Sequence, residues 1–209
     1  MIKLAPEGYP FIVFFAAVTA AAFYAGGAPI ALLPFILTLF MLYFFRDPDR
    51  TVPAEEGCYV SPADGRVLQV HTVTENVYLK GAAIEVSIFM SPLDVHVNRA
   101  PCNGVVESVV HTPGRFLSAF KPEASSVNEN IALLLKGDHG QALVRQVAGA
   151  VARRAVCRVK PGDVLKKGER YGIIKFSSRV DIFFPEDTDI RVKPGDRVKA
   201  GETTLGCRR

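Results

Sequence analysis

The chain has 209 residues and a formal net charge of +4, which is long enough for one domain with an additional segment. Its basic residues form no stripe interleaved with aromatic residues, so the composition argues against a nucleic-acid partner and fits an anionic membrane surface better. Hydrophobic residues make up 49% of the chain, and they are concentrated near its start, where no charged residue occurs between Gly8 and Phe45.

The apolar segment from Pro10 to Phe45 is interrupted by the sequence Gly-Gly-Ala-Pro at 26–29, which is typical of a turn. Each half has about 15 residues, or roughly 22–24 Å as a helix. That length is short of the hydrocarbon core of a bilayer, which is about 30 Å thick. The sequence therefore predicts a membrane-anchoring domain over residues 1–45, folded as a helical hairpin or as a shallow re-entrant wedge.

Basic residues flank both ends of this segment, with Lys3 on one side and Arg46 and Arg50 on the other. Because positive charge is retained on the cytoplasmic side of a membrane, we expect both ends of the hairpin to face the cytoplasm. The remainder of the chain, residues 46–209, would then lie at the cytoplasmic face of the cell membrane, held there peripherally or by the hairpin.

Residues 46–209 consist of short apolar runs, rich in β-branched residues, between Gly, Pro and Asp turns. This pattern predicts a mainly β domain, with one helix near Gly114–Ala124. The sequence RVKPGDVLKKGE at Arg158–Glu169 returns as RVKPGDRVKAGE at Arg191–Glu202, with nine of twelve positions identical. Pro-Gly-Asp is typical of a turn, so we predict a duplicated strand–turn–strand unit resembling the lobes of biotinyl/lipoyl-type barrel-sandwich hybrids.

The four cysteines are widely separated and form no Cys-x-x-Cys pair with metal-ligand spacing. We therefore expect no metal site and four free thiols in a reducing compartment, at Cys58, Cys102, Cys157 and Cys207.

Several motifs contain residues with catalytic or binding chemistry. Asp64 lies in SPADGRV, where an Asp before a Gly also suits an ordinary turn. His96 lies in FMSPLDVHVNRAPCNG, and a His in a polar loop is the natural proton carrier near neutral pH. The segment HTPGRFLSAFKPEASSVNEN suits either anion binding or a solvated loop, and both readings stay open; its candidate substrate-binding residues are His111, Arg115, Lys121, Asn128 and Glu129.

Together and in this order, the motifs FFRDPDR, SPADGRV, MSPLDVHVNRAPCNG, PGRFLSAFKPEASSVNEN, VAGAVARRAV and GIIKFSSRVDIFFP resemble the short form of the phosphatidylserine decarboxylase family. The resemblance implies a proenzyme that cuts itself between Ser177 and Ser178, giving a β chain of residues 1–177 and an α chain of residues 178–209. Ser178 would become a covalent pyruvoyl group, the electron sink for decarboxylation of a phospholipid's serine headgroup.

The resemblance also implies roles for two further residues. His96 is expected to transfer protons, and Asp64 to orient or charge it. The chain departs from the family pattern twice: Arg99 stands where longer members have a second His, and Ser177 stands where the family has Gly. Since a Cβ narrows the backbone angles that glycine tolerates, we expect Ser177 to slow self-processing.

Two alternatives stay open on the residues alone. A non-catalytic, membrane-anchored barrel-sandwich adaptor would explain the anchor and the repeat, but not the matched positions Asp64, His96 and Ser178. A decarboxylase acting on another serine-headgroup lipid, such as archaetidylserine, would use the same chemistry. The sequence implies a phospholipid substrate and leaves homo-oligomerisation open.

Overall fold

The structure, a computed structural model, describes residues 3–121, 123–149, 154–176 and 178–208. Its contacts divide the chain into two compact units, Met1–Asp49 and Arg50–Arg209.

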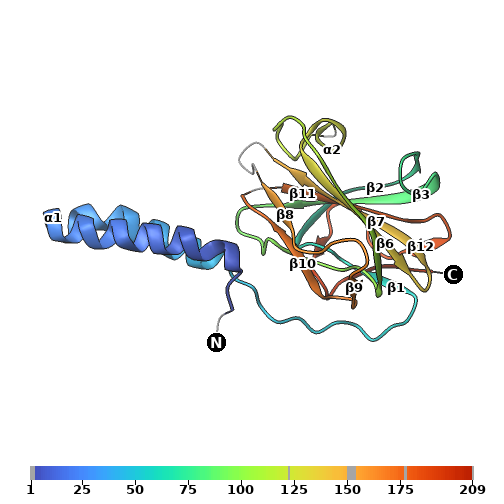
Figure 1. Cartoon of the computed structure of the whole chain (residues 1–209), viewed down its shortest axis with the longest axis horizontal. Helices are drawn as coiled ribbons and strands as arrows, with labels where there is room; N and C mark the ends of the chain where they lie inside the picture. The colour runs from blue at the N-terminus through green and yellow to red at the C-terminus, as the bar shows by residue number, and fades with distance from the viewer. Residues whose placement is uncertain (1–2, 122, 150–153, 177, 209) are drawn as a thin grey trace. The chain divides into compact units, whose positions relative to one another are not determined.

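The N-terminal unit contains a short 3-10 helix, η1 (Pro6–Gly8), followed by the helical segment α1 (Tyr9–Phe44). The backbone of α1 leaves helical geometry at Gly26 and Gly27, where Gly27 has a φ of 73° that L side chains rarely adopt. The two halves run back along each other (Figure 1), and the hydroxyls of Thr19 and Thr38 lie 3.2 Å apart. The predicted helical hairpin is confirmed, and the glycine pair is its turn.

The hairpin is apolar on all sides rather than along one stripe. The Pro6–Phe44 segment has a mean hydropathy of 2.0, and within the described residues it alone is long and apolar enough to cross a membrane. Large apolar side chains on it are exposed, among them Tyr24 at 90% and Leu33 at 67%. A helix without a polar face is stable only when protein or lipid covers it, which is consistent with membrane association.

The second unit is built almost entirely of antiparallel strands, which confirms the predicted mainly β fold (Figure 1). One sheet has eight strands in the order β13-β2-β3-β11-β7-β6-β5-β9, and two smaller sheets have the orders β1-β14-β12 and β4-β10-β8. The elements are β1 (Cys58–Val60), β2 (Gly65–Glu75), β3 (Gly81–Met90), β4 (Val97–Arg99), β5 (Gly104–Thr112), α2 (Ala124–Val127), β6 (Asn130–Gly137), β7 (Gly140–Ala148), β8 (Ala155–Cys157), β9 (Val164–Leu165), β10 (Arg170–Ile174), β11 (Ser178–Pro185), β12 (Thr188–Ile190), β13 (Arg197–Val198) and β14 (Thr204–Arg208).

The sequence repeat corresponds to a repeat in the topology. One half supplies β13-β2-β3-β11 and the small sheet β1-β14-β12, and the other supplies β7-β6-β5-β9 and β4-β10-β8. The two Pro-Gly-Asp turns are held alike: the Gly162 N–H donates to Val106 O at 2.8 Å, and the Gly195 N–H donates to Val67 O at 2.9 Å. Both glycines have positive φ, 93° and 96°. The unit is therefore a duplicated strand arrangement.

The larger hydrophobic cluster lies on one face of the eight-stranded sheet and takes residues from both halves, including the fully buried Tyr171 and Phe184, and a smaller buried cluster includes Leu143 and Phe183. In β11, the residues Val180, Ile182 and Phe184 face the larger cluster. Because alternate residues of a strand share a face, Ser178 faces the larger cluster as well.

The prediction of four free cysteines is wrong. Cys58 and Cys207 form a disulfide across the antiparallel pair β1–β14, and Cys102 and Cys157 are the free ones. The two bonded residues are 149 positions apart in sequence, yet they are direct partners in the strand register. Sequence spacing carries no information about such a long-range register, which is why the pair was missed.

Candidate active site

Ser178 is the first residue of β11 and is fully buried. In the sheet it lies between Met90 of β3 and Ala148 of β7, at the centre of the eight strands. Its Oγ is 3.4 Å from the Met90 Sδ, a weak acceptor. The hydroxyl is thus shielded from water, and the partner that it has among the described residues is a weak acceptor.

The backbone just before Ser178 has an unusual conformation. Phe176 has a φ of 62°, in the left-handed region that a bulky side chain rarely occupies. Such a conformation costs roughly 1–3 kcal/mol and occurs most often at functional sites. Ser177, the residue expected to precede the cut, lies outside the described residues.

His96 is fully buried and directly precedes β4. Its carbonyl accepts a hydrogen bond of 3.3 Å from the N–H of Ile174, which ends β10 four residues before Ser178. Its ring Nδ1 lies 3.0 Å from the carbonyl oxygen of Asp94. A carbonyl only accepts, so Nδ1 carries a proton. When the ring is neutral, Nε2 then has the lone pair that a base needs.

Two buried amides beside Ser178 were not singled out by the sequence. The Asn98 side chain lies 3.8 Å from the same Met90 sulfur that Ser178 contacts, and Gln146 Nε2 donates to Asn98 Oδ1 at 2.8 Å. Asn98 belongs to the His96 motif, two residues further along the chain, so it was open to prediction. Gln146 had no comparable signal, because only the pairing of β6, β7 and β11 brings it here.

Asp64 forms a partly buried ion pair with Arg50, with oxygen–nitrogen distances of 2.8 and 3.0 Å. Its Oδ1 also accepts the N–H of Ala200 at 2.8 Å. Burial raises the pKa of the Asp64 carboxyl, and the Ala200 N–H and the Arg50 guanidinium oppose that shift. Among the described residues the hydrogen bonds of this carboxylate go to Arg50 and Ala200, so its expected link to His96 stays a prediction.

The other half of the duplication clarifies what Asp64 does. There Asn103 stands before Gly104 as Asp64 stands before Gly65, and the Asn103 Oδ1 accepts the N–H of Lys167 at 2.8 Å. The bond to Ala200 is therefore part of the repeated architecture. What distinguishes the Asp64 half is its negative charge and the pairing of that charge with Arg50.

The candidate substrate-binding residues lie in and beside the loop that contains α2. The amide of Asn128 is buried, and among the described residues its partners are backbone groups: its Oδ1 accepts the Leu117 N–H at 2.9 Å, and its Nδ2 donates to the carbonyls of Leu117 and Ala148 at 2.8 and 2.7 Å. Asn128 therefore closes the loop rather than presenting a free amide to a ligand.

The remaining candidates are on the surface. His111 Nε2 lies 3.2 Å from Glu129 Oε1, with the His side chain about half exposed. Arg115 and Lys121 are exposed cations, and the backbone of Arg115 is bonded to Val127 and Glu129, which fixes its place. These two residues are the ones in the loop that suit a phosphate.

Asn128→Ala should lower the free energy of unfolding by about 3 kcal/mol, because one buried and two partly buried backbone groups lose their partner at once. Asn103→Ala is the matched control, since it removes one hydrogen bond at an exposed position and should cost less than about 1 kcal/mol. Urea unfolding of both variants measures the difference. Equal losses of unfolding free energy in the two variants would contradict the conclusion that the Asn128 side chain holds the loop closed.

Arg179, the residue after Ser178, points to the opposite face of the sheet and is 1% exposed. Its guanidinium is 2.5 Å from Asp181, 2.6 Å from Ser87 and 3.3 Å from Glu85. The Asp181 carboxylate also accepts a hydrogen bond of 2.5 Å from Ser125 in α2. This buried network fixes the start of β11 to β3 and to the α2 loop.

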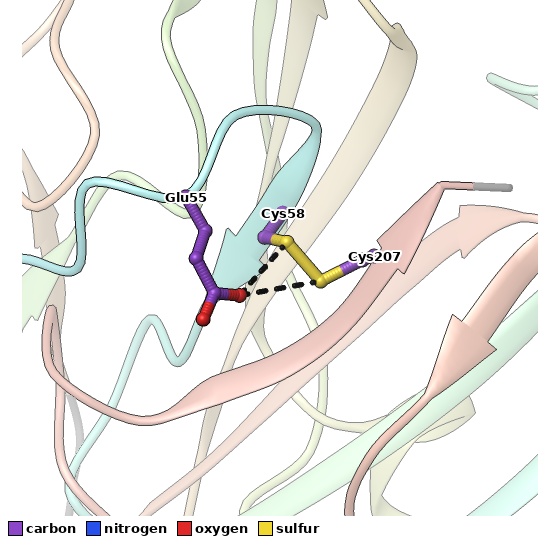
Figure 2. Close-up of side chains that lie close together, drawn as sticks. All are labelled: Glu55, Cys58 and Cys207. Atoms are coloured by element: carbon purple, nitrogen blue, oxygen red, sulfur yellow. Dashed lines mark hydrogen bonds between the residues drawn. A yellow bond between two sulfur atoms is a disulfide. The ribbon is translucent and has the colours of Figure 1, made fainter.

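Within the described residues, one group of side chains is close enough together to suggest a metal ion: Glu55, Cys58 and Cys207. Figure 2 shows the carboxylate of Glu55 beside the two sulfurs, at 3.3 Å from Cys58 and 3.8 Å from Cys207. The sulfurs are bonded to each other, so they do not act as thiolate ligands in this state. A cavity of about 470 Å³ adjoins this group and includes none of the candidate catalytic residues in its lining.

The fold and the site define a mainly β protein with an apolar helical hairpin, in which Ser178 and His96 are both fully buried. The model of the phosphatidylserine decarboxylase family matches residues 37–206. Relatives named phosphatidylserine decarboxylase proenzyme include one from Carboxydothermus hydrogenoformans, 48% identical over 85% of this chain and 84% of its own length. Those from Syntrophus aciditrophicus and Desulfotalea psychrophila are 45% and 41% identical, over 97% and 98% of this chain and 96% of their own lengths. The chain belongs to the phosphatidylserine decarboxylase family.

Proposed function

We propose that this chain is a pyruvoyl-dependent phosphatidylserine decarboxylase that first cuts itself between Ser177 and Ser178. The observation that carries the proposal is the setting of Ser178: a buried hydroxyl at the start of a central strand, two residues after the positive φ of Phe176. Within the part of the chain that the structure describes, the buried Ser178 hydroxyl has a thioether as its hydrogen-bond partner, which is poorly explained by a structural role alone.

Self-cleavage would begin with the Ser178 hydroxyl adding to the carbonyl carbon of residue 177. The peptide C–N bond breaks, an ester C–O bond forms, and the hydroxyl proton passes through the base to the freed nitrogen. Loss of the Ser178 Cα proton then breaks the ester, and residue 177 leaves as a carboxylate. Water replaces the nitrogen, which departs as ammonia. His96 Nε2 is the base best suited to these proton transfers, because the other ring nitrogen, Nδ1, donates its proton to the Asp94 carbonyl.

The residues present fit a pyruvoyl group at position 178. The group is made from the atoms of Ser178, so it needs no space beyond the one that this residue already has, and the strand partners Met90 and Ala148 hold its backbone. Once formed, it supplies a carbonyl that binds the substrate amine and accepts electrons as carbon dioxide leaves. Asn98 and Gln146 keep this buried region polar on one side, and His96 returns a proton to the product.

The hairpin α1 would bring the site to the cytoplasmic surface of the cell membrane, where the serine headgroup lies. Its all-round apolar surface supports insertion, and Lys3, Arg46 and Arg50 at its ends support the cytoplasmic side. Of the candidate phosphate-binding residues, Arg115 and Lys121 are the exposed cations of the α2 loop.

Replacing Arg115 or Lys121 by Gln should raise KM for phosphatidylserine vesicles about threefold to tenfold and leave kcat within twofold. The reason is that an exposed cation–phosphate contact binds substrate and transition state alike. Steady-state kinetics on vesicles of fixed charge measure the two parameters. Lys136→Gln, which changes an exposed cation of β6 outside the α2 loop, is the control. A fall in kcat with unchanged KM would contradict phosphate binding by the loop.

The function itself is tested by incubating processed protein with vesicles of phosphatidylserine or archaetidylserine. Loss of phosphatidylserine, gain of phosphatidylethanolamine and release of carbon dioxide are the expected results. Turnover of archaetidylserine alone would favour the alternative lipid. A correctly processed sample that releases no carbon dioxide from either lipid would contradict the proposal and favour the adaptor.

A further inference from the structure

We propose that the disulfide between Cys58 and Cys207 is a covalent link between the two chains of the processed protein. This inference rests on the proposed self-cleavage between Ser177 and Ser178. Cys58 lies in residues 1–177 and Cys207 in residues 178–209, so the bond would join the two products.

The duplication shows that the fold does not require a covalent bond at this place. Cys58 of β1 pairs with Cys207 of β14, and the corresponding strands β4 and β10 pair Val97 with Ile173. In that half, the apolar pair Val97 and Ile173 stands where the disulfide stands in the other half, and the two strands pair without a covalent bond. The difference between the halves is that β4 and β10 both belong to residues 1–177, whereas β1 and β14 fall on opposite sides of the cut.

The place of the link suits the end of the small chain. Residues 178–209 are already held at their start, where β11 runs between β3 and β7. Their last strand, β14, has one partner from the large chain, β1, and one from the small chain, β12. A bond from β1 to β14 therefore fixes the end of the small chain whose last strand has one large-chain partner, where β11 at the start has two. It also makes re-association after local opening intramolecular.

Most of the surface of the two bonded cysteines is buried, which slows exchange with small thiols, and the adjoining cavity that Cys58 lines gives an oxidant access to the sulfurs. Cys58 is 7% exposed and Cys207 is 9% exposed, and thiol–disulfide exchange requires access to a sulfur. Formation is a two-electron oxidation: the two cysteine thiols lose two protons and two electrons to a disulfide oxidant such as glutathione disulfide, which becomes two thiols. We expect the bond, once formed, to persist under conditions that keep exposed thiols reduced.

Two measurements on the full chain test the link. After treatment with glutathione disulfide and removal of the oxidant, alkylation of the denatured protein should modify two cysteines rather than four. On denaturing gels, the fragment 178–209 should appear only when reductant is present. Cys58→Ser and Cys207→Ser should each release that fragment without reductant, and Cys157→Ser, a change of a free cysteine, should not.

Four alkylated cysteines after oxidation, or release of the fragment from the unsubstituted chain without reductant, would overturn the link. If two cysteines are alkylated but no fragment appears in either lane, the self-cleavage proposal has failed. The disulfide is then only an internal crosslink, and its role as a link between chains is overturned with it. The thiol count and the gel thus distinguish failure of the bond from failure of the cut.

Discussion

Ser178→Ala should give a single uncut chain with no detectable decarboxylase activity. Without the hydroxyl there is no nucleophile for the cut, and without the cut there is no pyruvoyl group to accept electrons. We expect the rate with phosphatidylserine vesicles to fall at least about 10⁶-fold, to the level of the uncatalysed reaction. Denaturing gels under reducing conditions and carbon dioxide release measure the two effects.

The loss should be chemical and not a failure to fold. Ser178 Oγ contacts only the Met90 sulfur among the described residues, so its removal costs little packing, and the melting temperature should change by a few degrees at most. Ser126→Ala, a change of an exposed hydroxyl in α2, is the matched control and should be cut normally. A Ser178→Ala chain that is still cut at the same place would contradict the assignment of the nucleophile.

His96→Gln should slow self-cleavage by roughly 10²–10⁴-fold, the usual contribution of a positioned general base. Glutamine keeps a hydrogen-bonding side chain of similar length next to Asp94, but it has no nitrogen that accepts a proton. The time course of fragment appearance on reducing gels measures the rate. Partial recovery of cleavage in His96→Ala on addition of imidazole would separate loss of the base from loss of the fold.

The control for His96 is His111→Gln. His111 is about half exposed and pairs with Glu129 at the surface, so its removal should leave the rate of cleavage within about threefold. If His111→Gln is slowed as strongly as His96→Gln, the two residues share the proton transfers. If His96→Gln is cut at the normal rate, the base is another group, and the hydrogen bond between His96 Nδ1 and the Asp94 carbonyl has no role in self-cleavage.

Features that depend on local chemistry could be predicted from the sequence. Neighbouring residues determine the Gly26–Gly27 turn, the strand periodicity and the repeated Pro-Gly-Asp turns. The structure confirms the hairpin and the mainly β fold. Ser178 could be singled out because it lies in a long family motif. Its burial at the centre of the eight-stranded sheet follows only from the assembled structure.

Features that depend on long-range register could not be predicted. The Cys58–Cys207 bond requires β1 and β14 to pair at one register across 149 residues. The bond from Gln146 to Asn98 likewise joins strands 48 positions apart. The ion pair of Asp64 with Arg50, the first residue of the second unit, was likewise not predicted, and the expected action of Asp64 on His96 stays a prediction.

The most direct test of the account is an intact-mass spectrum of the purified protein, denatured and reduced. We predict a fragment of residues 178–209 that is lighter by one ammonia than the unmodified peptide, together with residues 1–177. Since Ser177 is expected to slow processing, the same spectrum of the Ser177→Gly chain should show faster and more complete conversion. A spectrum with only the uncut 209-residue chain, in both proteins after long incubation, would contradict the account.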